Sequence, residues 1–329
     1  VTHGYGSNGC GSAYANMFGK HLRGFKFTDE PFAPSAEDLW NGANPIFNLG
    51  LGYDTIGGNK VIRIEPKSYF YSNVKSIDLS YCKNVKRRWD LEMFFKTVEN
   101  GYSVYSIESK GGIDDPQCVV THNTRFATMG IDFSSLSSWF AASLGIEQVR
   151  RMQGTDNTKD SSIDNTTVII ALNKSDLTLQ ELDENFDSIT HLNNPETRYN
   201  IRLSAKRCFK RWQNFFAGCL QVGARKDFYY ADGKGNNKMV SKITASDCEG
   251  GASLRENQDV INNGPKLFTP GIYELDTKLT LTQYQTIIAN REKAIGISKT
   301  NTGHQTCSII SFKWKPTSNK VKGMLVWIK

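Results

Sequence analysis

The sequence contains no long hydrophobic run. Its longest purely apolar stretches are residues 168–172 and 324–328. Both fall well short of the ~20 consecutive apolar residues that a membrane-spanning helix needs. We therefore expect neither a membrane span nor a membrane anchor.

The motifs of metal and cofactor sites are also missing. The cysteines form no CxxC pair, and the histidines stand singly without HxH or HxxxH spacing, the patterns that mark zinc sites. No glycine-rich loop has the GxGxxG or P-loop form that cradles phosphate. The sequence therefore predicts no metal, no cofactor and no enzymatic activity.

The cysteines are few and scattered along the whole chain. They are Cys10, Cys82, Cys118, Cys208, Cys219, Cys248 and Cys307. An odd, dispersed set is typical of reduced thiols that pack as small apolar residues. This pattern predicts no disulfide framework and favours synthesis in the cytosol or nucleus.

Two local clusters leave other chemistry open. Cys10 lies in the run Gly-Cys-Gly-Ser and would suit a cysteine hydrolase if a histidine lay beside it. The glycines and serines around it favour a loop instead. Asp114 and Asp115, just before Pro116, suit a calcium site as well as an ordinary turn.

The composition itself is that of a globular protein. Hydrophobic residues make up 39% of the 329 residues and charged residues 22%, a balance that disordered chains lack. A chain of this length can bury a core without covalent cross-links. We expect a single domain over residues 1–329, in which residues 1–60 form an extended N-terminal arm and loop region.

Most regular segments show the two-residue period of half-buried strands. Apolar side chains alternate with polar ones around residues 77–81, 199–203, 310–314 and 321–328, and residues 168–172 suit a strand buried on both faces. Helices are few: residues 134–144 have helical spacing, and residues 280–291 fit a helix or a strand. These patterns predict an all-β sandwich or barrel with a few short helices and long loop insertions.

Positive charge gathers in two places. The first cluster comprises Arg198, Arg202, Lys206, Arg207, Lys210 and Arg211, and the second comprises Lys86, Arg87 and Arg88. Basic side chains neutralise phosphates, and the aromatic residues interleaved with the first cluster could stack on unpaired bases. The alternative is a solvated sheet face whose aromatics belong to the core. We predict that these nine basic residues contact nucleic acid.

The first cluster carries a resemblance to a known family. Residues 198–212 resemble a segment in capsid proteins of small circular single-stranded DNA viruses that encode a replication initiator. In that family a basic strand leads into a Lys/Arg-Pro-Phe-Lys-Arg-Tyr-like patch, and here Cys208 replaces the proline. The order of a Phe-containing helix (133–144) followed by a strand (146–150) is similar too. The length of the chain is closest to the bacilladnaviruses.

The resemblance implies an eight-stranded jelly-roll β-sandwich whose copies assemble into an icosahedral shell around single-stranded DNA. The implied partners are further copies of the chain and the viral genome, with no membrane. The implied location is the virion, after synthesis in the host cytoplasm and assembly there or in the nucleus. Two alternatives remain: the capsid of a small positive-strand RNA virus, and a β-sandwich enzyme or lectin such as a cysteine hydrolase around Cys10.

Overall fold

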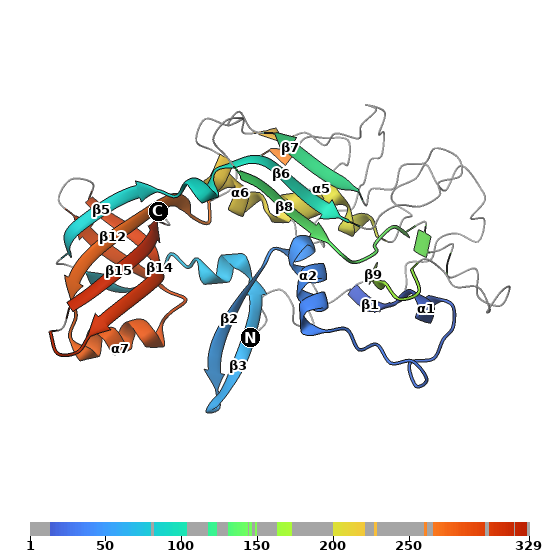
Figure 1. Ribbon diagram of the computed structural model, residues 1–329, viewed down its shortest axis with the longest axis horizontal. Helices are drawn as coiled ribbons and strands as arrows, with labels where there is room; N and C mark the ends of the chain where they lie inside the picture. The colour runs from blue at the N-terminus through green and yellow to red at the C-terminus, as the bar shows by residue number, and fades with distance from the viewer. Residues whose placement is uncertain are drawn as a thin grey trace.

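The structure is a computed structural model rich in strands (Figure 1). It describes residues 14–79, 82–103, 118–123, 131–143, 145–146, 149, 163–172, 200–220, 227–228, 260–261, 266–299, 303–318 and 320–327. The described strands form five sheets of two to six strands. The strand-rich class predicted from the sequence is confirmed.

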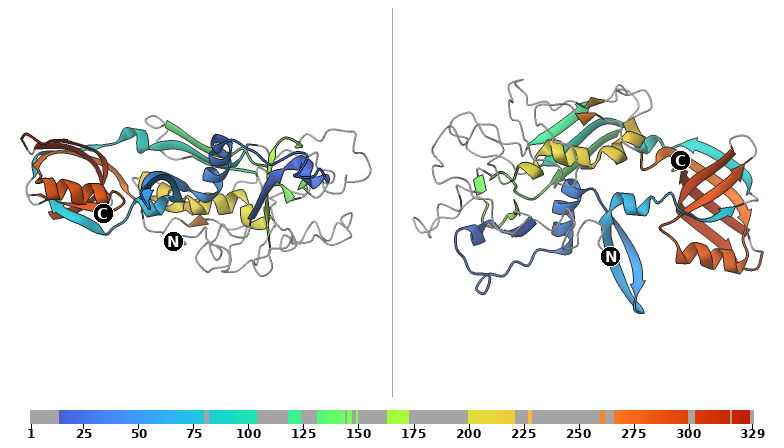
Figure 2. Two further views of the ribbon diagram at one scale, coloured as in Figure 1. Left: turned by 90° about the horizontal axis from the view of Figure 1, so that it is seen from below. Right: turned by 180° about the vertical axis from the view of Figure 1, so that it is seen from behind.

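The largest sheet has six strands in the order β4-β13-β14-β15-β12-β5. Their bounds are β4 (Lys75–Leu79), β5 (Cys82–Trp89), β12 (Thr269–Lys278), β13 (Ala294–Lys299), β14 (Gly303–Lys315) and β15 (Lys320–Trp327). All neighbours are antiparallel except β4 and β13. The sheet curls into a half barrel (Figure 2), as the right-handed twist of strands favours.

One face of this sheet, the inner face, packs against helix α7 (Leu281–Ala289). Leu275, Ile295 and Ile297 are buried there around Ile287 of the helix. Thr280 caps α7 by accepting a hydrogen bond from the Gln283 backbone N–H at 3.2 Å, and the Gln283 side chain accepts one from Thr280 N. This capping box starts a helix in a segment whose sequence is compatible with either a helix or a strand.

A second core lies under a three-stranded sheet. Its strands are β6 (Phe95–Tyr102), β7 (Val119–Asn123) and β8 (Ile131–Ser137), with β6 in the middle, and the helices α5 (Ala205–Arg211) and α6 (Gln213–Leu220) cover it. Phe209, Trp212 and Phe216 pack against Phe95 and Phe133. The aromatic residues that follow the basic turn, Phe209, Trp212, Phe215 and Phe216, are therefore core residues.

Helix α2 (Ala36–Phe47) packs beside β8 and α5 of the second core. Ser35 caps it by accepting a hydrogen bond from Asp38 N at 3.0 Å. Near its other end, the Pro45 carbonyl accepts hydrogen bonds from Trp212 Nε1 at 2.8 Å and Asn100 Nδ2 at 3.2 Å. Carbonyls in the last turn of a helix have no partner within it, so these side chains satisfy the helix end and tie α2 to the second core.

The remaining pairs are short. They are β1 (Tyr14–Phe18) with β9 (Thr167–Ala171), β2 (Leu49–Ile56) with β3 (Asn59–Pro66), and β10 (Asp227–Phe228) with β11 (Val260–Ile261). The short helix α1 (Gly19–Leu22) follows β1. Strand β9 is buried along its whole length, as its apolar sequence predicts.

The strand predictions for β4, β14 and β15 are confirmed, and three other predictions are wrong. Residues 134–137 belong to strand β8, where a helix was expected, and residues 201–203 form a 3-10 turn (Ile201–Leu203), where a strand was expected over 199–203. Helix α5 follows this turn. The expected arm at 1–60 holds regular elements from Tyr14 onward. The single-domain expectation stays a prediction.

The turn before α5 depends on Asn200, which is fully buried. Its Nδ2 donates to the carbonyls of Ala141 at 2.6 Å and Ile169 at 2.9 Å, and its Oδ1 accepts from Ala171 N at 2.7 Å. One amide side chain thus satisfies three backbone groups of other segments. These bonds hold residues 200–204 against β9 and out of an extended conformation.

We expect Asn200→Ala to lower the free energy of unfolding by about 2–4 kcal/mol, because three buried backbone groups lose their partner. Urea denaturation measures this loss. The matched control is Asn59→Ala, an exposed position that should change stability by less than about 0.5 kcal/mol. Equal effects of the two substitutions would contradict the role given to Asn200.

Candidate nucleic-acid interface

The predicted basic residues separate into two places in the structure. Lys86, Arg87 and Arg88 lie on the exposed edge strand β5. Five others lie in the turn before α5 and in α5 itself, and Arg198 lies outside the described residues. The structure therefore does not bring the two clusters together on one strand face.

The residues of the α5 cluster lie largely in the interior. Arg202 is 5% exposed, Lys206 1% and Arg207 0%, while Lys210 and Arg211 are half-buried. The guanidinium of Arg202 donates to the Leu172 carbonyl at 3.0 Å, and that of Arg211 donates to the Arg202 carbonyl at 2.7 Å. Contact of these residues with nucleic acid stays a prediction, and burial in the folded chain does not favour it.

The reason for this burial is the helical period. In a strand, alternate side chains would have pointed the arginines away from the core. Ser204 instead caps α5, with Arg207 N donating to its hydroxyl at 3.3 Å. Successive side chains of a helix point in different directions around its axis. Residues 205–209 of α5 are all buried, so Arg207 lies in the interior together with Ala205 and Cys208.

We expect Arg207→Ser to lower the free energy of unfolding by at least about 2 kcal/mol, because it replaces a large, fully buried side chain by a small one and leaves a cavity. Lys86→Ser, at an exposed position, should change it by less than about 0.5 kcal/mol. Thermal or urea unfolding compares the two. A fully stable Arg207→Ser protein that had lost nucleic-acid affinity would show that Arg207 is a surface residue.

Strand β5 shows a different geometry. Asn84 has a positive φ of 52° and forms a bulge, so that both Asn84 and Val85 lie across from Leu275. Val85 therefore packs toward the inner face, while Lys86 and Arg88 take positions on the opposite, outer face. Arg87 returns to the inner face, where its guanidinium lies 4.7 Å from the centre of the Trp89 ring.

The outer face of the six-stranded sheet carries lysines at matching positions on neighbouring strands. In the register of the backbone, Lys322 on β15 lies opposite Lys313 on β14, and the position of Lys320 lies between Lys278 on β12 and Lys315 on β14. We call these five positions the lysine rows. The side chains of Lys278, Lys313, Lys315 and Lys322 are all exposed.

The acidic residues of the outer face, Glu274 and Asp276, lie on β12 between β5 and β15, and Asp276 lies directly opposite Lys322. Glu274 pairs with Arg88 at 3.0 Å, and Asp276 accepts a hydrogen bond from Asn84 at 2.9 Å. Within the part of the chain that the structure describes, the four exposed lysines of the rows form no ion pair. Directly opposed like charges destabilise a sheet, so the pair of Lys313 and Lys322 is a local cost to folding, which Asp276 on the other side of Lys322 partly offsets.

The lysine rows were not predicted from the sequence, although the alternation along their strands is visible in it. Lys313 alternates with Phe312 and Trp314, and Lys322 alternates with Val321 and Gly323. Each strand by itself reads as an ordinary solvated face. Only the register between strands places the lysines opposite one another, and that register is not a local property of the sequence.

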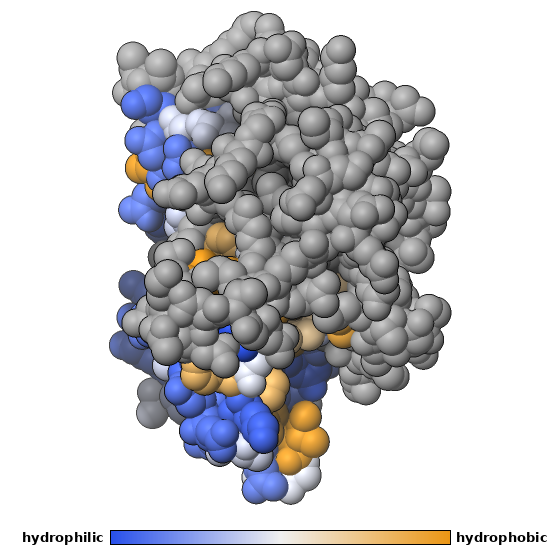
Figure 3. Space-filling view, turned by 90° about the vertical axis from the view of Figure 1, so that its right-hand side faces the viewer, coloured by the Kyte–Doolittle hydropathy of each residue, from blue (hydrophilic) through white to orange (hydrophobic). Residues whose placement is uncertain are grey.

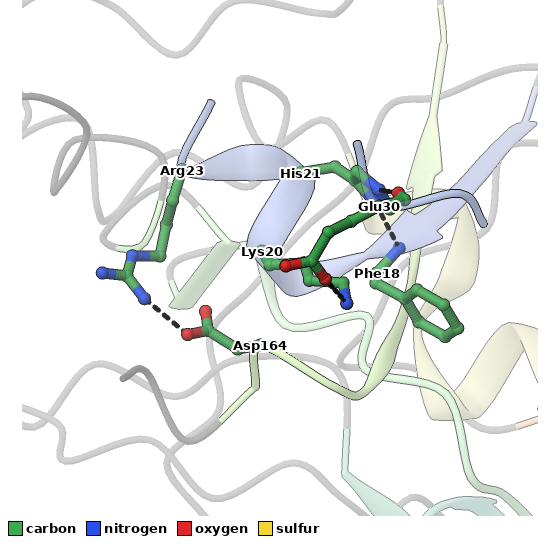
Figure 4. Close-up of polar contacts among 6 residues, drawn as sticks. All are labelled: Phe18, Lys20, His21, Arg23, Glu30 and Asp164. Carbon is green, nitrogen blue, oxygen red and sulfur yellow. Dashed lines mark hydrogen bonds and ion pairs between the residues drawn. The ribbon is translucent and has the colours of Figure 1, made fainter. Parts of the chain in front are cut away.

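Both ring nitrogens of His21 lie beside backbone groups (Figure 4). Its Nδ1 accepts a hydrogen bond from Phe18 N at 3.1 Å, and its Nε2 lies 2.7 Å from the Glu30 carbonyl oxygen. Both ring nitrogens are thus used by the backbone, and the proton lies on Nε2. Lys20 pairs with Glu30, and Arg23 pairs with Asp164, so the cluster stabilises the chain around α1.

The described residues show no cluster of metal ligands and no activated thiol. They contain no group of three or more potential metal ligands, and Cys10 and Asp114 lie outside them. Cys82, Cys118, Cys208 and Cys307 are free thiols. Burial raises the pKa of the Cys307 thiol to about 12, which disfavours the reactive thiolate.

Comparisons with known proteins give no relative. The chain matches no family model, and searches of curated proteins and of solved structures find no match either. Among the described helices, none has the length and apolar character required to cross a membrane. The interpretation of the lysine rows therefore rests on their geometry and charge.

Proposed function

We propose that this protein is the subunit of a viral shell that binds single-stranded nucleic acid on the outer face of its six-stranded sheet. The lysine rows are the observation that carries this proposal. Lys278, Lys313, Lys315 and Lys322 are exposed, and all five positions share one sign of charge and are held in place by the strand register. A polyanion is the partner that such a surface fits.

Binding of this kind is electrostatic. Lysines that neutralise phosphates release the counterions condensed on the nucleic acid, and this release drives affinity at low salt. All five positions of the lysine rows are lysines, so none of them offers an aromatic ring that could stack on a base. The expected binding therefore uses phosphate contacts, which hold the strand without reading its sequence.

The proposal includes a jelly-roll fold for the chain. A jelly roll is built from antiparallel strands in two packed sheets. The curled, mainly antiparallel six-stranded sheet supports it, whereas the parallel pair β4 and β13 departs from it. In this proposal the location is the virion, assembled in the host cytoplasm or nucleus, with single-stranded DNA as the genome.

The substitution of Lys313, Lys315 and Lys322 together by serine tests the proposal. We expect weaker binding of single-stranded DNA and a slope of log affinity against log salt that is smaller by up to about 2, since each phosphate contact contributes about 0.7. We also expect unchanged or slightly higher stability, because like charges no longer face each other. Fluorescence anisotropy across a salt series measures the binding.

The matched control removes three other lysines, Lys26, Lys266 and Lys293, and so changes the net charge equally. It should leave the salt slope nearly as in the wild type. Equal loss in both variants would mean that net charge alone attracts the nucleic acid, and no loss in either would contradict the proposed face. A parallel titration with single-stranded RNA tests the alternative of an RNA virus shell.

A further inference from the structure

The hairpin of β2 and β3 projects from the rest of the chain (Figures 1 and 3). Its turn is formed by Gly57 and Gly58, both with positive φ, 59° and 84°, as tight two-residue hairpin turns require. It is a two-stranded sheet with no further strand on either edge among the described residues. Such a hairpin is marginally stable unless one of its faces is packed.

One face of the hairpin packs against its own chain, and this face is the polar one. Gly50 and Gly52 lie so close to the Phe70 ring that an added Cβ would come within 2.4 and 2.7 Å of it. On the same face Arg63 pairs with Asp54 and donates to the Tyr69 hydroxyl at 2.9 Å. The ion pair of the hairpin therefore lies on the side that the chain partly covers, with the Arg63 side chain 20% and the Asp54 side chain 40% exposed.

The other face is apolar and exposed. Leu51 lies directly opposite Ile64, and Tyr53 lies directly opposite Ile62. Tyr53 is 75% exposed and Ile62 63%. Figure 3 shows hydrophobic side chains beside the projecting tip at the lower end of the molecule. This arrangement inverts the usual rule that the polar face of a hairpin meets water.

The size and charge of this face indicate its occupant. Four large apolar side chains offer on the order of 300–400 Å² of apolar surface, the size of a functional patch. The four carry no charge, so a second identical face could approach without repulsion. The nearest cation in the same row is Lys60, opposite Thr55 close to the tip, and antiparallel packing of two hairpins would keep the two lysines apart.

We propose that the apolar face of this hairpin, Leu51, Tyr53, Ile62 and Ile64, packs against the same face of a second copy of the chain. The contact rests on the self-assembly proposed above and names the surface that would carry part of it. Two such faces bury on the order of 700 Å², less than the ~1,000 Å² of a self-sufficient interface. The contact is therefore weak alone and gains strength where several contacts close an assembly.

A charge-swap experiment tests this contact. Ile62→Glu and Ile62→Lys each place an ionised group at the centre of the face, and burial of an unpaired charge should weaken self-association about tenfold or more. An equimolar mixture of the two variants should restore association, because opposite charges then meet across the contact. Sedimentation velocity over a concentration series measures the assembly state of each sample.

The control is Ile310→Glu, at an exposed apolar position on the six-stranded sheet, which should leave association unchanged. Loss of association in both Ile62 variants without recovery in the mixture would show that the face packs on something other than itself, and would overturn the inference. Variants that associate like the wild type would overturn it while leaving shell formation intact. A wild-type chain that stays monomeric at all concentrations, with and without single-stranded DNA, would overturn both proposals.

Discussion

The register between β14 and β15 is the constraint on which the candidate site depends. Strand β14 sends Cys307, Phe312 and Trp314 to the core beneath α7, and the register places Lys313 and Lys322 at opposed positions on the other face. A slip of one residue would turn lysines into that core and aromatic side chains such as Trp314 out of it. The core thus fixes Lys313 opposite Lys322, although the two lysines repel each other. The residues that stabilise the sheet therefore lie on one face, and those proposed to bind nucleic acid lie on the other.

The chain places its charged and apolar groups in ways that local composition does not reveal. The densest basic segment, around α5, is largely interior and supports the aromatic core. The strands β12, β14 and β15 carry their lysines on an exposed face. The hairpin of β2 and β3 reverses the pattern again, with the ion pair of Arg63 and Asp54 on its partly covered face and Ile62 and Ile64 on its exposed face. Both exposed surfaces are costly for an isolated chain and favourable for one that binds nucleic acid and further copies.

The sequence predicted those strands whose alternation runs over one buried face, β4, β14 and β15, because hydrophobic burial decides their conformation. It failed at residues 200–203, where alternation is also present, because the side-chain bonds of Asn200 and the cap at Ser204 direct the backbone into a turn followed by a helix. It failed at residues 134–137 because a short run of apolar residues at helical spacing also fits a buried strand, and periodicity alone does not separate the two. The lysine rows depend on pairing between distant strands, so no local pattern could show them.

Electron microscopy of the chain mixed with single-stranded DNA tests the central claim most directly. Shell formation driven by the lysine rows and by contacts between copies predicts closed particles of uniform size that contain nucleic acid protected from nuclease. Raised salt should release that nucleic acid, because the binding is electrostatic. Single dispersed molecules, with DNA as accessible to nuclease as free DNA, would contradict the proposed function.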